Sequence, residues 1–315
     1  GRVMDHIGRK TLKLENLRTI VLDEADEMLN MGFREDIETI LSFVPEERQT
    51  VLFSATMPPP IMAITKEYQN DPVVIKVESK ARTVDTIEQK YFEVPMGRKT
   101  DALKLLLIAY EPKLSMVFCN TKKMVDELTE ALVSKGFKAA GLHGDMKQAS
   151  RTQVLSAFKS GSINVLIATD VAARGIDVEG VDCVFNYDLP QDNEYYIHRI
   201  GRTGRAGKSG AAYTIISGRK QFYELKNIAS FIKADIARAE LPGRDEIVAR
   251  KAAHVNEKIL SAVESGKYES CRADVQKLME SGLSAEDIAV ALLGMRLSKD
   301  TKNIPEIISV PRDNG

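Results

Sequence analysis

The most constraining feature of this chain is a short apolar run that leads straight into three acids: residues 20–26, Ile-Val-Leu-Asp-Glu-Ala-Asp. A strand that is buried on both faces of a parallel sheet carries no charge along its length, so its polar groups collect where it ends. Ligands of open α/β sheets bind at that carboxyl edge. The pattern therefore predicts a parallel α/β fold with a site at Asp23, Glu24 and Asp26. Such acids suit Mg²⁺ bound to nucleotide phosphates, with Glu24 placed to orient and deprotonate an attacking water.

Length and composition indicate an ordinary globular protein. The 315 residues allow two domains and a sizeable core. No apolar run approaches the roughly 20 residues that cross a bilayer, so we expect no membrane partner. Cys119, Cys183 and Cys271 are far apart and form no Cys-x-x-Cys pair. This spacing argues against a disulfide framework or a zinc site and favours the reducing cytoplasm, with three ordinary buried thiols as the plainest interpretation.

Apolar β-branched runs alternate with segments of helical period. Strands are expected at 18–22, 50–53, 73–77, 114–118, 138–142, 164–167, 182–186 and 212–216. Helices are expected at 34–43, 60–69, 99–110, 122–134, 148–158, 193–200 and 219–233. Such alternation predicts βαβ units and mostly parallel sheets, which gives the α/β fold class.

The chain changes character at two points. Residues 79–90 are polar and lack a long apolar period, so they are expected to link a first domain over 1–78 to a second over 91–240. The strand signal ends near residue 240, and residues 244–297 are expected to form a small all-helical unit. Residues 298–315 have no periodic pattern and are expected to be a flexible tail.

Ser54 and Thr56 follow the strand expected at 50–53. Small hydroxyl residues at a strand end can hydrogen-bond the acids of a neighbouring strand. Alone they would be ordinary loop residues, but paired with the acids at 23–26 they support a joint site.

Residues 168–177, Ala-Thr-Asp-Val-Ala-Ala-Arg-Gly-Ile-Asp, follow another expected strand. Thr169 and Arg174 suit phosphate contacts, Gly175 permits close backbone approach, and Asp177 could accept from a ribose hydroxyl. An ordinary βα loop with a capping aspartate explains the segment equally well.

The most specific motif is residues 198–205, His-Arg-Ile-Gly-Arg-Thr-Gly-Arg. Arg202 and Arg205 are three residues apart, so one helical turn would aim both the same way. An arginine that contacts a γ-phosphate accelerates phosphoryl transfer about 10³–10⁵-fold. A basic surface turn is the alternative, but the apolar Ile197 and Ile200 beside the cations speak against it.

These four motifs occur in the order and spacing that is typical of DEAD-box ATP-dependent RNA helicases, which residues 1–240 closely resemble. Gly1-Arg2 resembles the end of a further RNA-contact motif. Residues 117–121 and 143–151 resemble two more motifs, the second with Gln148 and Arg151. His198 favours this branch over the related DEAH type, which carries glutamine there.

The resemblance implies two RecA-like domains, the first incomplete, that bind ATP and RNA between them. Its implied cofactors are ATP and Mg²⁺, with Asp23 holding Mg²⁺ through water and Glu24 activating the attacking water. It links Asp26 to Ser54, Thr56 and His198, and assigns Asp177 to the ribose and Arg202 and Arg205 to the γ-phosphate. The implied RNA-backbone contacts, which would not depend on sequence, are Arg2, Thr121, Gln148, Arg151, Thr169, Arg174 and Gly175.

One expected motif is absent from the printed residues. A phosphate-binding loop has the pattern Gly-x-x-x-x-Gly-Lys-Ser/Thr after a strand. The nearest match, residues 201–209, has five intervening residues and follows an expected helix. We therefore expect an amino-terminally truncated helicase chain that is inactive alone.

The helical unit at 244–297 resembles the dimerisation segment of some bacterial cold-shock and ribosome-assembly DEAD-box helicases. A homodimer is one interpretation, and a helical pair folded back on the second domain is another. Two other functions stay open for the chain: a non-catalytic module for RNA binding and dimerisation, and a DNA-directed helicase of the same superfamily. The intact motif acids and arginines disfavour the first, and His198 disfavours the second.

Overall fold

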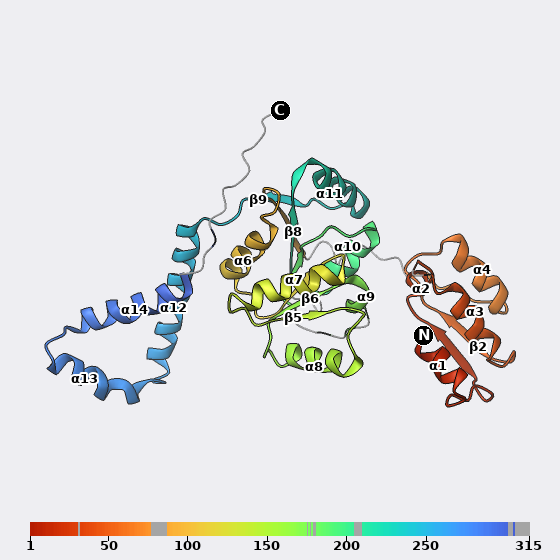
Figure 1. The fold of residues 1–315 in the computed structure, drawn as a ribbon, viewed down its shortest axis with the longest axis horizontal. Helices are drawn as coiled ribbons and strands as arrows, with labels where there is room; N and C mark the ends of the chain where they lie inside the picture. The colour runs from red at the N-terminus through yellow and green to blue at the C-terminus, as the bar shows by residue number, and fades with distance from the viewer. Residues whose placement is uncertain are drawn as a thin grey trace. The chain divides into compact units, whose positions relative to one another are not determined.

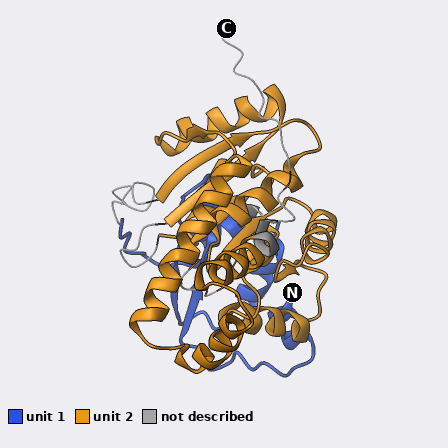
Figure 2. Cartoon of the chain, turned by 90° about the vertical axis from the view of Figure 1, so that its left-hand side faces the viewer, with its two compact units in different colours: residues 1–78 blue, residues 79–315 orange. Residues whose placement is uncertain are grey.

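The computed structural model describes residues 1–30, 32–76, 87–174, 176, 178, 181–204, 210–301 and 305. The chain divides into two compact units, residues 1–78 and 79–315, which Figure 2 shows in separate colours. Within the described ranges, no helix has the length and apolar character needed to cross a membrane.

The first unit is built on a two-stranded parallel sheet. Strand β1 (Thr19–Leu22) pairs with β2 (Gln49–Leu52) so that Leu22 lies opposite Leu52. Its helices are α1 (Arg2–Gly8), α2 (Ala25–Asn30), α3 (Arg34–Ser42) and α4 (Pro59–Tyr68). The core combines strand and helix residues, namely Leu22, Ala25, Ile37, Leu41, Val44, Ile61 and Ile64. The motif acids thus lie at the junction between β1 and α2.

The second unit contains a seven-stranded sheet in the order β5-β6-β4-β7-β8-β3-β9 (Figure 1). The strands are β3 (Ile87–Glu93), β4 (Ser115–Phe118), β5 (Ala139–Leu142), β6 (Val165–Ala168), β7 (Cys183–Asn186), β8 (Gly210–Ile216) and β9 (Ala237–Ala239). Every strand pairing among the described residues is parallel, which confirms the predicted α/β class with parallel sheets.

Helices cover both faces of this sheet. They are α6 (Lys99–Tyr110), α7 (Lys122–Val133), α8 (Gln148–Lys159), α9 (Asp170–Ala173), α10 (Asn193–Ile200) and α11 (Gly218–Ile232). Alternate residues of a strand point to opposite faces. In β4, Val117 packs with α6 and α7, whereas Met116 and Phe118 pack with α8 and α9. The result is a three-layer arrangement with the sheet in the middle.

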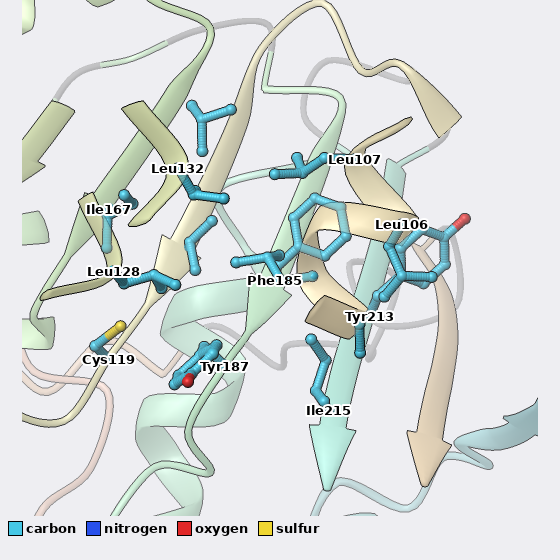
Figure 3. Packing of buried hydrophobic residues seen from close by; sticks show 14 of the residues in the cluster. Leu106, Leu107, Cys119, Leu128, Leu132, Ile167, Phe185, Tyr187, Tyr213 and Ile215 are labelled. Atoms are coloured by element: carbon cyan, nitrogen blue, oxygen red, sulfur yellow. The ribbon is translucent and has the colours of Figure 1, made fainter. Parts of the chain in front are cut away.

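Figure 3 shows the largest core cluster of the sheet domain among the described residues, between the sheet and helices α6 and α7. Leu106, Leu128 and Leu132 from the helices meet Phe185 and Ile215 from β7 and β8. Burial of each such side chain contributes about 1.5–3 kcal/mol. This core holds the carboxyl ends of the central strands in fixed positions.

A helical extension follows the sheet. It consists of α12 (Arg244–Glu264), the 3₁₀ turn η2 (Glu269–Cys271), α13 (Arg272–Glu280) and α14 (Ala285–Thr301). Ser284 and Asp287 each accept a hydrogen bond from the other's backbone N–H at the start of α14, which is the pattern of a capping box. The all-helical expectation for this segment is confirmed.

The extension is anchored to the sheet domain through α12. Ile247 is fully buried against Leu105 of α6. Lys251 Nζ lies 2.7 Å from the carboxylate of Glu111, and Arg250 stacks over the ring of Tyr110. The first turns of α12 therefore pack against the sheet domain. The alternative of a helical pair folded back on that domain agrees with this packing for α12.

Three boundary expectations differ from the structure. The strand expected at 73–77 is not formed over 73–76, which belong to no strand, and residue 77 lies outside the described residues. A β-branched run forms a strand only where it packs against a neighbouring strand. Strand β3 begins at Ile87, so residues 87–90 belong to the sheet and not to a linker, while 79–86 lie outside the described residues. Helix α14 continues to Thr301, past the expected end at 297, since no helix breaker occurs before Pro305.

Candidate functional site

Two carboxylates are presented to solvent just beyond β1. Asp23 and Glu24 are both exposed, and Asp23 Oδ1 accepts from the backbone N–H of Glu24 at 3.0 Å. Glu24 has a φ of 49°, in the left-handed region, which costs a non-glycine residue about 1–3 kcal/mol. The turn is fixed on both sides, because Ala25 N donates to Phe53 O at 3.1 Å.

The third acid of the motif is buried and fully engaged. Asp26 is 2% exposed, and its Oδ2 accepts from the backbone N–H of Thr56 at 2.7 Å and from Thr56 Oγ1 at 2.8 Å. Ser54 Oγ accepts from Asp26 N and donates to Thr56 O. Burial by itself would raise the pKa of Asp26, but the hydrogen bonds from Thr56, Ser54 and Glu27 outweigh it and hold the pKa below its usual value.

The predicted link between Asp26 and the hydroxyl residues is therefore present within the first unit. It ties the end of β1 to the end of β2. His198 belongs to the other unit, so its predicted contact with Asp26 stays a prediction.

A buried arginine organises the corresponding edge of the second unit. Arg199 is 1% exposed and forms a two-point ion pair with Asp170, at 2.6 and 2.7 Å. The same guanidinium donates to Asn120 Oδ1, Asn186 Oδ1 and the carbonyl oxygen of Asp188. These partners follow or end β6, β4 and β7, so one side chain connects three neighbouring strand ends.

Several predicted site residues meet at a pocket beside this arginine. The pocket is lined by Phe118, Asp170, Ala173, Arg174, Tyr195, His198, Arg199 and Arg202. Arg174 lies over the ring of Tyr195, with its Cζ 4.9 Å from the centroid. Arg202 Nη1 donates to Ile176 O at 3.1 Å, which ties the arginine motif to the segment after α9. The structure thus brings Arg174, His198 and Arg202 together.

The remaining predicted residues occupy helix starts. Thr121 caps α7 by accepting from Met124 N, Thr169 precedes α9, and Gln148 opens α8. Arg151 Nη2 donates to Ala172 O at 3.3 Å and so links α8 to α9. Arg2 is the first residue of α1 in the first unit, and Gly175, Asp177 and Arg205 lie outside the described residues.

Sequence reasoning missed Arg199, Asp170 and Asn120. All three stand inside or beside recognised motifs, but their contacts join positions 29 and 79 residues apart along the chain. The available signal was the charge of Arg199 beside His198, between the apolar Ile197 and Ile200. A cation there needs a buried partner.

Comparisons with known proteins assign the motifs to one family. The DEAD/DEAH box helicase model matches residues 1–64, the helicase conserved C-terminal domain model matches 98–207, and the RNA helicase DeaD dimerization domain model matches 242–307. A DEAD-box ATP-dependent RNA helicase CshA from Geobacillus kaustophilus is 48% identical over 96% of this chain and 64% of its own. The chain belongs to the DEAD-box RNA helicase family.

Solved structures of DEAD-box helicases agree with this assignment. S. cerevisiae Dbp5 bound to RNA and ADP BeF3 matches with a TM-score of 0.71 and 34% identity, over 78% of this chain and 65% of that one. A Dbp5 variant bound to the same ligands gives 0.69 and 32%, over 83% and 67%. The α/β units are accordingly RecA-like domains with parallel sheets, followed by a helical dimerisation domain. The chain spans less than two thirds of the length of the curated relatives it matches.

Proposed function

We propose that the protein is an ATP-dependent RNA helicase that separates or remodels short RNA duplexes as it hydrolyses ATP. The observation that carries this proposal is the pairing of Asp26 with Ser54 and Thr56 behind the exposed Asp23 and Glu24. A binding module has no need of a buried carboxylate network that holds two further acids at a strand end. The family membership of the chain supports the same function.

The exposed acids suit a magnesium–nucleotide complex. Mg²⁺ takes oxygen ligands and in nucleotide sites binds one or two carboxylates, water and the phosphates. Over the residues that the structure describes, no group of three or more His, Cys, Asp or Glu side chains could hold a metal ion by itself. Asp23 fits a lesser role, in which its carboxylate contacts the cation through an intervening water molecule. When bound, the cation would neutralise charge on the β- and γ-phosphates.

Each of the predicted site residues then has its own role in ATP hydrolysis. Glu24 accepts a proton from water as the water oxygen bonds to the γ-phosphorus, and the bond to the β–γ bridging oxygen breaks with its electron pair leaving on ADP. Asp26 keeps its ionised form and positions the turn. Arg202 and Arg205 stabilise negative charge on the transferring group, and Asp177 accepts from the ribose.

RNA is the proposed partner of the second unit. Thr121, Gln148, Arg151 and Thr169 lie at helix starts that follow strand ends, where backbone N–H groups and cations suit phosphates. Arg174 follows the end of α9 and supplies a further cation. Gly175 and Arg2 are also proposed to contact the sugar-phosphate backbone of the RNA. Contacts of this kind position RNA without reading its sequence, and they make binding sensitive to salt.

A homodimer through the helical extension is also proposed. Large apolar side chains of α12, α13 and α14 are exposed, including Val263 at 74% and Leu292 at 59%. Exposed apolar surface of this extent marks protein contacts. The match of the DeaD dimerization domain model to residues 242–307 supports a second copy as the partner.

The proposed activity is tested by Glu24→Gln in the full-length protein, with Glu47→Gln as an exposed control in the same unit. We expect RNA-stimulated ATP turnover to fall about 10²–10⁴-fold while ATP binding persists. Unchanged turnover would refute the role of Glu24. Equal stimulation by DNA would favour the DNA-directed alternative, and absence of turnover in the unaltered protein would favour a binding module.

The 315 residues contain no Gly-x-x-x-x-Gly-Lys-Ser/Thr run. We infer that these residues by themselves turn over ATP negligibly, because that run is what cradles the phosphates in sites of this kind. The same assay on the 315-residue chain checks this, and RNA-stimulated turnover at a normal helicase rate would contradict it.

A further inference from the structure

Helix α11 carries a surface that neither the motifs nor the dimerisation domain uses. Arg219, Phe222, Tyr223, Lys226 and Ser230 recur at spacings of three and four residues, so they share one side of the helix. We call these five residues the α11 surface. It holds two cations, two aromatic rings and no acid.

The rings and cations of the α11 surface form a connected group. The ring centroids of Phe222 and Tyr223 are 5.8 Å apart, and those of Phe222 and Tyr91 of β3 are 6.2 Å apart. Lys226 Nζ lies 4.8 Å from the centroid of Phe222. Tyr223 is 62% exposed, and Lys226 is exposed as well. The ring of Tyr223 is thus open to solvent beside a cation, with the partly buried ring of Phe222 next to it.

The opposite side of α11 explains why this arrangement is rigid. Leu225, Ile228 and Ile232 are buried in the core that α11 shares with α10 and β8. In Figure 1, α11 lies at the end of the sheet that contains β8 and β9. Phe222 is partly buried and packs against the same core, whereas Tyr223 is exposed and contributes little to folding. The α11 surface is therefore held in place from its buried side, and Tyr223 can be replaced without loss of the fold.

We propose that the α11 surface binds single-stranded RNA that extends beyond the helicase motifs. Stacking on exposed rings combined with cations along a groove or helix is the usual recognition of single strands. Arg219 and Lys226 are seven residues apart, about 10.5 Å along the axis, so they suit different phosphates with Tyr223 between them. An acidic peptide would use the cations but would leave the ring without a stacking partner.

This inference rests on the proposed RNA helicase function and assigns it a second RNA contact. The test uses the full-length protein and two RNAs: a short duplex, and the same duplex with a single-stranded extension. We expect Tyr223→Ala combined with Lys226→Gln to weaken binding of the extended RNA about tenfold, the loss of one stacked base and one phosphate contact. Binding of the short duplex and its stimulation of ATP turnover stay unchanged.

Two further variants sharpen the result. Tyr223→Phe keeps the ring and should retain the affinity for extended RNA, whereas Lys135→Gln removes an exposed lysine from another helix end and should have no effect. Loss of Lys226 should also reduce the slope of log affinity against log salt by about 0.7 for single strands. Cross-linking of thiouridine in the extension to residues 219–230 would support the assignment directly.

The outcomes separate this inference from the proposed function. If the double variant binds both RNAs as the unaltered protein does, the α11 surface is not an RNA site and the helicase function stands. If the double variant loses an acidic protein partner and no RNA, the RNA assignment is overturned in favour of that partner. If the unaltered protein binds neither RNA, the proposed function fails and this inference fails with it.

Discussion

Arg199 and Asp170 face each other through two parallel hydrogen bonds, Nε to Oδ1 at 2.6 Å and Nη2 to Oδ2 at 2.7 Å. The planar guanidinium matches a carboxylate in this way, and an ammonium group does not. Arg199 also lies over the ring of Phe118, with its Cζ 5.2 Å from the centroid. The other hydrogen bonds of Arg199 reach Asn120 after β4 and Asn186 at the end of β7. The Arg199–Asp170 pair therefore holds in place the segment that brings His198 and Arg202 to the pocket.

Replacing this arginine should destabilise the second unit. Arg199→Lys keeps the charge but cannot maintain bonds to both oxygens of Asp170 and to Asn120. Breaking a buried ion pair by removing one partner costs about 3–5 kcal/mol, and the lysine variant should lose a substantial part of that. Urea unfolding followed by hydrogen exchange in β4 and β7 measures the loss.

A matched control exists on the helical extension. Arg272 forms a similar two-point pair with Glu269, at 2.8 and 2.9 Å, but both side chains are exposed. Arg272→Lys should therefore leave the unfolding midpoint nearly unchanged, since water screens the pair. Equal losses in the two variants would show that burial of Arg199 has no special weight.

Asp26 should make the first unit sensitive to acid. Its pKa in the folded state is lowered from a usual value of 3.8, so its stabilising contribution is complete above that value. The contribution is lost as the pH falls through 3.8 toward the folded pKa, because the unfolded chain takes up the proton first. Asp26→Asn should cost about 1–3 kcal/mol at pH 7 by leaving buried donors poorly matched.

The measurement is the pH dependence of unfolding for the first unit, followed by hydrogen exchange in β1 and β2. The Asp26→Asn variant should lose stability less steeply below pH 3.8 than the unaltered protein. Asp5→Asn, at an exposed side chain of α1 paired with Arg9, serves as control and should keep the steep dependence. A variant curve parallel to the unaltered one would mean that another group governs the acid response.

The positions of the strand ends are predictable from the sequence, but the long-range side-chain contacts that join those ends are not. The sequence identifies β4, β6 and β7 because apolar strands buried on both faces read as continuous runs. Strand β1 also reads as such a run, although Thr19 and Val21 are exposed in the structure. Strand β3 escapes that reasoning since the polar run Glu88-Gln89-Lys90 interrupts its apolar residues, although the strand lies between β8 and β9. The link from Asp26 to Thr56 could be predicted because both lie at adjacent strand ends. The reach of Arg199 to Asn120 depends on the fold itself.

The helical extension should detach when its anchor is removed. Ile247 of α12 is fully buried against Leu105 of α6, so Ile247→Ala leaves a cavity and costs about 2–5 kcal/mol. Hydrogen exchange should speed up in the first turns of α12 while β4 and β8 keep their protection. Ile259→Ala, 43% exposed on the same helix, should change neither. Faster exchange throughout the sheet would show that α12 belongs to the core rather than resting on it.

Self-association should depend on the exposed apolar residues of the extension. Val263 of α12 and Leu292 of α14 are 74% and 59% exposed, so a charge at either position barely affects the folded monomer. In a dimer interface, Val263→Glu or Leu292→Glu would bury an unpaired carboxylate and weaken association by at least about tenfold. Sedimentation of the full-length protein over a range of concentrations measures this shift. Val133→Glu on α7, where the valine is 50% exposed, should not change it. A monomer at high micromolar concentration before any substitution would count against dimerisation, and the apolar residues would then require a different partner.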